Sequence, residues 1–403
     1  MREREAGLKI TAVKVRQVRG TMPTEGPFWE ERLVRPVDIY PEFRKEQHLA
    51  EYGRQVDDRS LEIEAYFLAI ETDDGVSGVA GPFREPCAHI VATQLRPILM
   101  GKDPLATEYL WDVMHRLLVH GRQGEAMFAI SVVDCALWDL KGKWLGQPVW
   151  RILGGPTRTE VPAYASMLGY AVLDPGRVRE RALAAKEQGF RAQKWFFRHG
   201  PMSGREGLAK NVELVRTLRE ALGDDDEIML DCWQSFDYRY LLELASRIEE
   251  YRPYWLEEAA LPDRIGTYRR IKDKIRIPLA GAEHDYTRWG MRRFIEQAAL
   301  DVYQPDPYWC GGLSETLKIA ALTTTHDLIC IPHGHSTPVN AAFSALQPPI
   351  HTPYQEYLVK WNAVHQHWFE QPLEPQDGMI RLPDFPGLCP ALDEAKIEAS
   401  AEL

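Results

Sequence analysis

The chain has 403 residues, of which 45% are apolar and 27% charged, as in ordinary globular proteins. Its net charge of −11 argues against a nucleic-acid partner, which needs a basic surface. No run approaches the roughly eighteen apolar residues of a membrane span, and the charged N-terminus lacks the apolar core of a signal peptide. The six scattered cysteines, without a C-x-x-C pair, favour reduced thiols and a cytoplasmic protein.

The first hundred residues predict an antiparallel sheet. KITAVKVRQVRG alternates apolar and polar residues, and LEIEAYFLAIETDDGVSGVAG predicts two strands joined at Asp74-Gly75, a strong hairpin signal. Residues 21–59 between the two stretches are rich in Pro, Glu and Arg, and a loop this long is functional or disordered. From residue 103 the pattern becomes helical, and apolar residues share one helical face at Ile130, Val133, Leu137 and Leu140.

Beyond Gly155, short apolar runs alternate with helical patterns. The runs are VPAYAS, FRAQKWFF, EIMLDCW, YWLEEA, IPLAGAE, LDVYQPD, LICIPHG and YQEYL. Each of the first seven is followed by a helical stretch, and this alternation predicts a parallel sheet closed into a barrel. Because no clear helix follows the eighth run, we expect the (β/α)7β form.

We therefore predict an α/β protein of three parts. Residues 1–155 form an N-terminal α+β capping domain, residues 156–360 form a (β/α)7β TIM-like barrel, and residues 361–403 pack back on the capping domain. In such barrels the active site lies at the carboxyl ends of the strands. The polar residue that ends each apolar run is therefore a candidate site residue.

Three successive runs end in acidic residues, namely Asp231, Glu257 or Glu258, and Glu283. Adjacent carboxylates at one rim repel one another unless a cation lies among them, and oxygen ligands favour a hard ion such as Mg²⁺. Any one of these residues could merely cap the following helix, but three in succession weaken that interpretation. Of the glutamate pair we favour Glu257, because only one of two neighbours on a strand faces the interior.

The next runs end in Asp306, His333 and Glu356. A carboxylate beside an imidazole fixes its tautomer and raises its basicity, so Asp306 and His333 predict a general base. A lone histidine is more often structural, but the matching Asp306 one strand away favours catalysis. The alternative is that His333 and His335 form a metal-binding pair. Because the carboxylates already provide a metal site, His333 is left free for proton transfer. Beyond Gly334 the strand geometry need not continue, so substrate, solvent and the next helix are all open directions for His335.

These residues resemble the enolase superfamily, in its mandelate racemase subgroup, over nearly the whole chain. SVVDCALWDLKGKWLGQPVWRILGG resembles the helix that leads into the barrel of that subgroup. LDCWQ, WLEEA, GAEH, QPDPYWCGGL, PHG and YQEY resemble its strand-end signatures in order and spacing. Within the subgroup, LDCW, EEA, QPD..WCGGL and PHG.S look most like the L-rhamnonate dehydratases.

The resemblance implies a Mg²⁺-dependent acid-sugar dehydratase, which is a carbon–oxygen lyase, and a homo-oligomer for which an octamer is one expectation. Such an enzyme removes the proton α to the carboxylate, forms an Mg²⁺-stabilised enediolate and eliminates the β-hydroxyl to give a 2-keto-3-deoxy acid. The implied roles are Mg²⁺ ligands at Asp231, Glu257 and Glu283, an acid/base pair of His333 and Asp306, and Glu356 near the developing enolate oxygen.

The strand that carries Lys194 favours dehydration over racemisation. Many members of this superfamily have K-x-K there, whereas this chain has Lys194 followed by Phe196 at the second position. A racemase needs bases on both faces of the substrate carbon, so the loss of one favours dehydration through His333. Lys194 is either an electrostatic contact for the substrate carboxylate or a buried counter-ion of the acidic residues.

Substrate contacts are predicted on the long N-terminal segment and beside the metal site. In this superfamily the segment closes over the barrel mouth, and Phe28 stands where rhamnonate dehydratases carry a histidine. The candidates are Trp29, Arg35, Arg44, Arg54, Arg59, His284 and His335.

Three alternatives are kept. The first is a racemase, epimerase or cycloisomerase of the same superfamily. The second is a zinc hydrolase that uses His333 and His335, with His284 as a further ligand. The third is a non-catalytic binding protein on the same fold.

Overall fold

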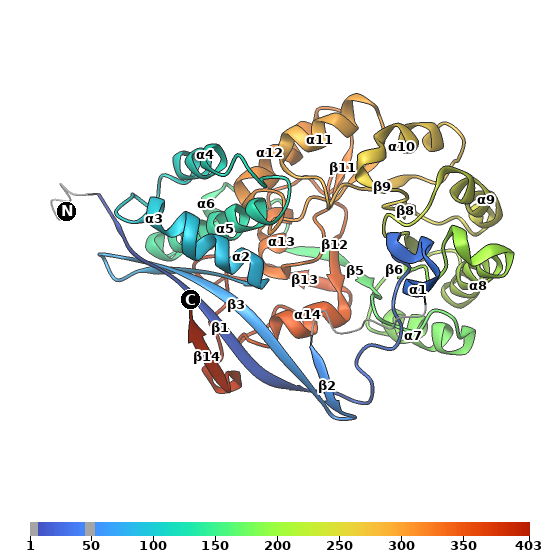
Figure 1. Ribbon diagram of the computed structural model, residues 1–403, viewed down its shortest axis with the longest axis horizontal. Coiled ribbons are helices and arrows are strands. Elements are labelled where there is room, and N and C mark those ends of the chain that lie inside the picture. Colours follow the sequence, from blue (N-terminus) through green and yellow to red (C-terminus); the bar gives the residue numbers. More distant parts are fainter. Residues whose placement is uncertain (1–6, 45–52) are drawn as a thin grey trace.

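The structure is a computed structural model that describes residues 7–44 and 53–403. Residues 45–52, part of the predicted long segment, lie outside the described residues. Figure 1 shows an antiparallel sheet beside a barrel that is surrounded by helices. No helix of the described residues has the length and apolar character needed to cross a bilayer.

The N-terminal sheet is antiparallel, as predicted. β3 is its centre and pairs with β1 on one side and with β2 and β4 on the other, while the C-terminal strand β14 pairs with β1. The predicted hairpin is confirmed: Gly75 takes a φ of +79° in the turn between β3 and β4. The strands are β1 (Ile10–Pro23), β2 (Arg54–Asp57), β3 (Ser60–Thr72), β4 (Ser77–Phe83) and β14 (Ala399–Glu402).

Helix α5 (Glu125–Leu145) joins this sheet to the barrel and is buried on nearly all sides. It packs on β4 and on α12 (Gly312–Thr324) of the barrel. Its buried Asp134 accepts hydrogen bonds from the backbone and hydroxyl of Ser314, and its buried Asp139 accepts from the backbone of Val79 and Leu388. The other helices of this part are α2 (Glu85–Ile90), α3 (Arg96–Leu99), α4 (Thr107–Leu117) and α6 (Val149–Ile152).

The eight predicted barrel strands are all present and form one parallel sheet. Their order is β11-β10-β9-β8-β7-β6-β5-β12. The two ends meet where Cys330 donates its N–H to the carbonyl of His351 (2.8 Å) and accepts from Thr352 (2.8 Å). The strands are β5 (Glu160–Ser166), β6 (Ala192–Phe196), β7 (Glu227–Asp231), β8 (Trp255–Glu257), β9 (Leu279–Gly281), β10 (Val302–Tyr303), β11 (Ile329–Cys330) and β12 (Gln355–Leu358).

A helix follows each of the first seven strands, as predicted, and these helices surround the barrel (Figure 1). Besides α12, they are α7 (Pro175–Glu187), α8 (Gly204–Leu222), α9 (Tyr238–Ile248), α10 (Ile265–Lys272), α11 (Thr287–Glu296) and α13 (Thr337–Ser344).

The expectation that no helix follows the eighth strand is wrong, because α14 (Val359–Gln366) begins directly after β12. Its sequence contains β-branched residues and Asn, which are weak helix formers, so packing rather than propensity stabilises it. Val364 packs in one cluster with Val18 and Leu61 of the N-terminal sheet. Helix α14 therefore belongs to the junction of the barrel with the cap, and the predicted combination of a barrel and a capping sheet is kept.

The segment between β1 and β3 is partly regular and lies against the barrel mouth. It contains a 3-10 turn (Pro36–Ile39), the short helix α1 (Pro41–Arg44) and β2. At the other end of the chain, β13 (Met379–Arg381) pairs with β5 and β14 pairs with β1, so this final segment contacts both the barrel and the cap.

Candidate active site

A cavity of about 1470 Å³ lies at the carboxyl ends of the barrel strands, beneath the capping segment. Parallel strands end at the same rim, so residues about one strand–helix unit apart in sequence become neighbours in space. The barrel wall of the cavity includes Lys194, Asp231, Glu283 and His333, and the capping wall includes Trp29, Arg32, Arg35 and Arg54.

Lys194, on β6, is a buried cation of this rim and is 1% exposed. Its ammonium lies 3.3 Å from Asp231 Oδ2 and 2.8 Å from Glu356 Oε1, and it also contacts Glu257 Oε1. Burial opposes the charge of Lys194, but Glu257 and Glu356 outweigh it and raise the pKa of Lys194 well above its usual value. Lys194 is therefore a charged counter-ion of the buried carboxylates, and it also lines the cavity.

Glu257 ends β8 and is fully buried. Its Oε2 accepts hydrogen bonds from Trp255 Nε1 (2.9 Å) and Gln304 Nε2 (2.8 Å). Burial raises the pKa of Glu257 well above its usual value, although Lys194 opposes the shift. Gln304, directly after β10, was not singled out from the sequence.

Glu258, Glu283 and His284 form a second acidic group whose ligand atoms lie within 4.8 Å of one another. His284 Nδ1 is 2.8 Å from Glu258 Oε1 and 3.4 Å from Glu283 Oε1. Glu258 has a φ of +43°, so the chain turns after β8 and the alternation rule, which assigned only Glu257 to the interior, does not extend to Glu258. Glutamate 258 is therefore a further acidic residue of the rim.

The donor set of this rim fits a divalent cation. Glu283 Oε2 is buried and has no hydrogen-bond partner among the described residues. Burial raises the pKa of both Asp231 and Glu283, and the neighbouring Glu258 adds to both shifts. One lysine cannot offset this much buried negative charge, whereas a hard cation with carboxylate ligands can. Asp231, Glu257, Glu258 and Glu283 are the residues that could hold it.

His333 and Asp306 are brought together, as their positions predict. His333 Nδ1 lies 2.6 Å from Asp306 Oδ2, and the other oxygen of this buried carboxylate accepts the backbone N–H of Tyr308 (2.7 Å). The carboxylate favours the tautomer with a proton on Nδ1, which leaves Nε2 as the basic nitrogen. Nε2 lies 3.7 Å from Glu283 Oε2, so it faces the acidic group.

Glu356, on β12, links Lys194 to the loop that carries His333. Its Oε2 accepts the backbone N–H of Gly334 (2.9 Å), while its Oε1 contacts Lys194. Burial opposes ionisation of Glu356, but Lys194 and His333 outweigh burial and lower its pKa. Glu356 is therefore ionised, and it holds both the ammonium of Lys194 and the backbone N–H of Gly334 in place.

Neither His333 nor His335 belongs to a group of potential metal ligands among the described residues, and His333 Nδ1 is bonded to Asp306. Among the described residues, the one group of three potential metal ligands is Glu258, Glu283 and His284. His335 is 6% exposed and lines the cavity beside His333.

The predicted contacts of the capping segment divide into two sets. Trp29 and Arg35 line the cavity, and Arg54 lines its outer part while its side chain, 77% exposed, pairs with Glu62. Arg44 instead donates to the carbonyl of Met202 (2.7 Å). Arg59 is exposed beside the turn between β2 and β3 and does not line the cavity. Loop side chains lack the periodicity that separates inward from outward positions, so sequence could not distinguish these arginines.

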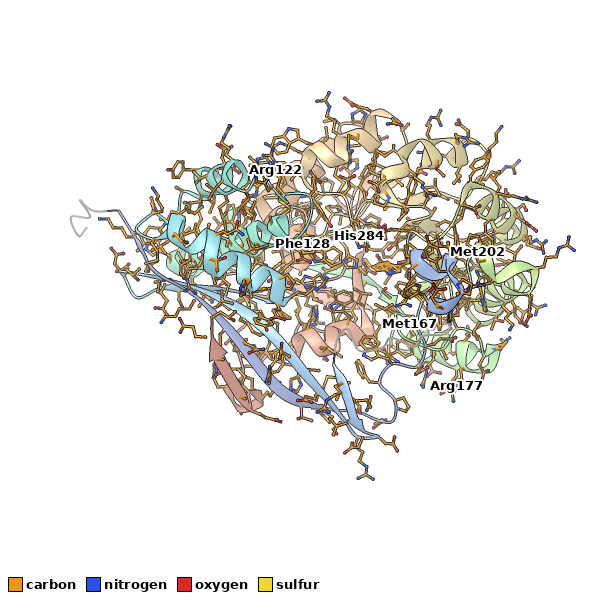
Figure 2. All side chains as sticks on the ribbon, viewed as in Figure 1. Arg122, Phe128, Met167, Arg177, Met202 and His284 are labelled. Carbon is orange, nitrogen blue, oxygen red and sulfur yellow. The ribbon has the colours of Figure 1, made fainter. Side chains whose placement is uncertain are left out.

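An aromatic wall that was not singled out from the sequence covers the site. Trp309 lies 4.7 Å from His333 and 5.6 Å from His284 between ring centroids, and it stacks on Phe128 of α5 at 5.5 Å. Figure 2 shows Phe128 and His284 close together near the centre of the molecule. Such a wall excludes water and strengthens electrostatic interactions inside the cavity.

Lys360, on α14, anchors the capping segment to the barrel and was also missed. Its ammonium donates to the carbonyls of Phe28 (2.5 Å) and Gly169 (3.0 Å) and lies 3.5 Å from Glu30 Oε1. Burial lowers the pKa of Lys360 to about 8, although Glu30 opposes the shift. A Cβ atom on Gly169 would lie 2.3 Å from the Trp29 ring, so this anchor also fixes the tryptophan beside the cavity.

Known proteins resemble the chain in both parts. Residues 177–396 match the family described as Enolase C-terminal domain-like, and residues 61–154 match the Mandelate racemase / muconate lactonizing enzyme, N-terminal domain. L-rhamnonate dehydratase from Saccharopolyspora erythraea is 33% identical over 93% of this chain and 95% of its own length.

Solved structures agree with this similarity. Rhamnonate dehydratase from Gibberella zeae, complexed with Mg, has a TM-score of 0.83 and 30% identity, covering 97% of this chain and 96% of its own. The 3,6-anhydro-D-galactonate cycloisomerase from Zobellia galactanivorans has a TM-score of 0.78 and 26% identity, with coverage of 97% and 100%. The chain is therefore an enzyme of the mandelate racemase / muconate lactonizing enzyme family within the enolase superfamily.

Proposed function

We propose that the chain is a Mg²⁺-dependent hydro-lyase that dehydrates an acid sugar, with L-rhamnonate as the first substrate to test. The observation that carries the proposal is the buried His333–Asp306 pair, whose free Nε2 faces Glu283 at 3.7 Å within the acidic rim. The relatives named L-rhamnonate dehydratase support this substrate class.

We assign Asp231, Glu257 and Glu283 as the Mg²⁺ ligands. They come from consecutive strands, and Asp231 and Glu257 are direct partners in the β7–β8 register. The bound ion supplies positive charge beside the substrate carboxylate and so favours loss of the α-proton. Lys194 adds a second positive charge from the β6 side and lines the cavity that receives the substrate.

His333 carries the proton in both directions. Its Nε2 accepts the α-proton as the C–H bond breaks, and Asp306 stabilises the imidazolium that results. The same nitrogen then returns the proton to the β-hydroxyl, which leaves as water as the C–O bond breaks. The enol that remains tautomerises to the 2-keto-3-deoxy acid.

A racemase, epimerase or cycloisomerase is the second candidate, and the similarity to a cycloisomerase favours it. The position of a second base on β6 is taken by Phe196, which lines the cavity with its ring centroid 5.4 Å from Lys194 Nζ. A phenyl ring cannot return a proton to the opposite face of the substrate carbon. This position therefore supports dehydration over racemisation.

The proposal is tested by incubating the purified protein with Mg²⁺ and a library of mono- and diacid sugars, with detection of 2-keto-3-deoxy products. We expect turnover of L-rhamnonate or of an acid sugar that differs from it at one carbon. Removal of Mg²⁺ with a chelator should abolish turnover, and its return should restore it. Absence of any 2-keto-3-deoxy product across the library would contradict the proposal.

A further inference from the structure

His335 faces the same cavity as His333 from a different position. Its backbone N–H donates to the carbonyl of His333 (3.0 Å), so the chain folds back between β11 and α13 and places both rings at one wall. The side chain is 6% exposed. Its Nδ1 is buried without a hydrogen-bond partner among the described residues, and it lies 3.9 Å from Asp306 Oδ1.

The His335 ring is held by aromatic neighbours. Tyr308 meets it edge-on at 4.8 Å and His365 at 4.8 Å between ring centroids. His365 Nδ1 lies 3.2 Å from the carbonyl oxygen of His335, and the indole N–H of Trp361 lies within hydrogen-bond distance of both ring nitrogens of His365, of which Nε2 is free to accept it. A single tautomer of His365 satisfies both contacts, so His365 and Trp361 fix the backbone that positions His335.

Geometry and charge define what the His335 ring can bind. Asp306 Oδ1 lies 3.9 Å from His335 Nδ1, which is beyond hydrogen-bond distance, but its negative charge favours the tautomer with the proton on Nδ1 and so leaves Nε2 as the acceptor. Burial, with His365 and His333, lowers the pKa of His335 well below its usual value. A neutral acceptor pairs with a hydroxyl hydrogen, and it offers nothing to a carboxylate.

We propose that His335 Nε2 accepts a hydrogen bond from a substrate hydroxyl beyond the two reacting carbons, so that His335 determines which acid sugar the enzyme accepts. His365 and Trp361 are positioning residues for this contact. The proposal rests on the proposed dehydratase function, because the reaction places the substrate carboxylate at the acidic rim and the α-carbon at His333. The remaining chain of the sugar then passes the neighbouring His335.

A site built to bind a hydroxyl rejects the analogue that lacks it, because the buried acceptor is left unpaired. The test compares L-rhamnonate with its 4-deoxy and 5-deoxy analogues, or the best acid sugar of the library with its deoxy analogues, in native protein and in His335→Phe. We expect the native protein to lose about 10- to 100-fold in kcat/KM on one of the two analogues. In His335→Phe the hydroxylated sugar and that analogue should differ by less than about 3-fold.

His335→Gln, which keeps an acceptor, should restore part of the discrimination and guards against a variant that fails to fold. His365→Phe should raise KM more than it lowers kcat, and His365→Gln should recover part of that loss. An equal effect of His335→Phe on all three sugars, or no effect, would overturn the inference.

The two proposals fail in different ways. If no acid sugar is turned over by the native protein, the dehydratase function fails, and calorimetric binding of the same sugars still measures the dependence on His335. If acid sugars are dehydrated but the His335 variants discriminate like the native protein, only the hydroxyl contact is wrong.

Discussion

The two walls of the cavity are held in different ways. On the barrel wall, Lys194, Asp231 and His333 are almost fully buried and held by charged partners at the strand ends. On the capping wall, Arg54 is largely exposed, and the segment is anchored through backbone carbonyls by Lys360. The barrel wall is fixed by ion pairs among the strand-end residues that carry the reaction, whereas the capping wall is fixed by contacts of its own loop, such as the N–H of Val34 with the carbonyl of Phe197. We therefore expect barrel changes to lower kcat and capping changes to raise KM.

The largest effect is expected for His333→Asn on the barrel wall. The variant removes the nitrogen that accepts the α-proton, so kcat should fall by about 10³- to 10⁴-fold while circular dichroism stays unchanged. His326→Asn, at an exposed histidine, is the matched control and should retain native kcat. A His333→Asn variant within 10-fold of native kcat would show that another group carries the proton.

The next largest effect is expected on Mg²⁺ binding, where two changes at the end of β8 distinguish Glu257 from Glu258. Glu257→Gln should weaken Mg²⁺ binding by at least about 10-fold in calorimetry, because a ligand with formal charge is lost. Glu258→Gln is the matched change one residue away, and it should weaken binding less, because Glu257 and not Glu258 is the direct partner of Asp231 in the β7–β8 register. The opposite order would make Glu258 the ligand and overturn our assignment.

On the capping wall, Lys360→Met should raise KM by roughly 10-fold with kcat within about 3-fold of native. The carbonyls of Phe28 and Gly169 lose their donor, so the segment that carries Trp29 is held less firmly. Lys274→Met, at an exposed lysine, is the control. A loss confined to kcat would mean that the two walls are not separable in this way.

Lys360 also predicts a pH dependence of stability. Its pKa is about 8 in the folded protein, lowered by burial from an ordinary value of 10.5. Between these values the unfolded chain binds more protons, so the contribution of Lys360 to the free energy of unfolding rises with pH, by up to about 3 kcal/mol. Urea titrations at pH 7, 8.5 and 10 should show this rise in the native protein relative to Lys360→Met. Equal slopes in both proteins would contradict the placement of a charged lysine in that junction.

The smallest effect is expected for Arg59→Ala. Arg59 is exposed and lies outside the cavity lining, so KM should change by less than about 2-fold and stability by less than about 0.5 kcal/mol. A large increase in KM would show that this part of the capping segment reaches the substrate during turnover.

Sequence predicted the barrel wall far better than the capping wall. Asp231 ends β7, and Glu283, Asp306 and His333 lie two or three residues beyond the ends of β9, β10 and β11. The period of the strand–helix unit determines where such residues lie. Glu258 was passed over in favour of Glu257 because the alternation rule was applied beyond the end of β8, where the backbone turns. Helix α14 was not predicted because tertiary packing on the N-terminal sheet, rather than local propensity, stabilises it.

The capping wall has no comparable rule. Trp29, Arg35 and Arg59 were indistinguishable in sequence, since irregular segments have no period that links position to direction. The role of Lys360 could not be predicted either, because its partners are the backbone carbonyls of Phe28 and Gly169. Every residue has a backbone carbonyl, so the sequence does not indicate which of them accept a hydrogen bond.

The most direct test follows the acid sugar by NMR in D₂O with the native protein and Mg²⁺. We predict a 2-keto-3-deoxy acid as the product, no inversion at the α-carbon of the remaining substrate, and formation of the keto acid at least about 10³-fold slower in His333→Asn. Solvent deuterium entering the α-position of unreacted substrate with inversion, and without any keto acid, would contradict dehydration through His333 and identify a racemase or epimerase instead.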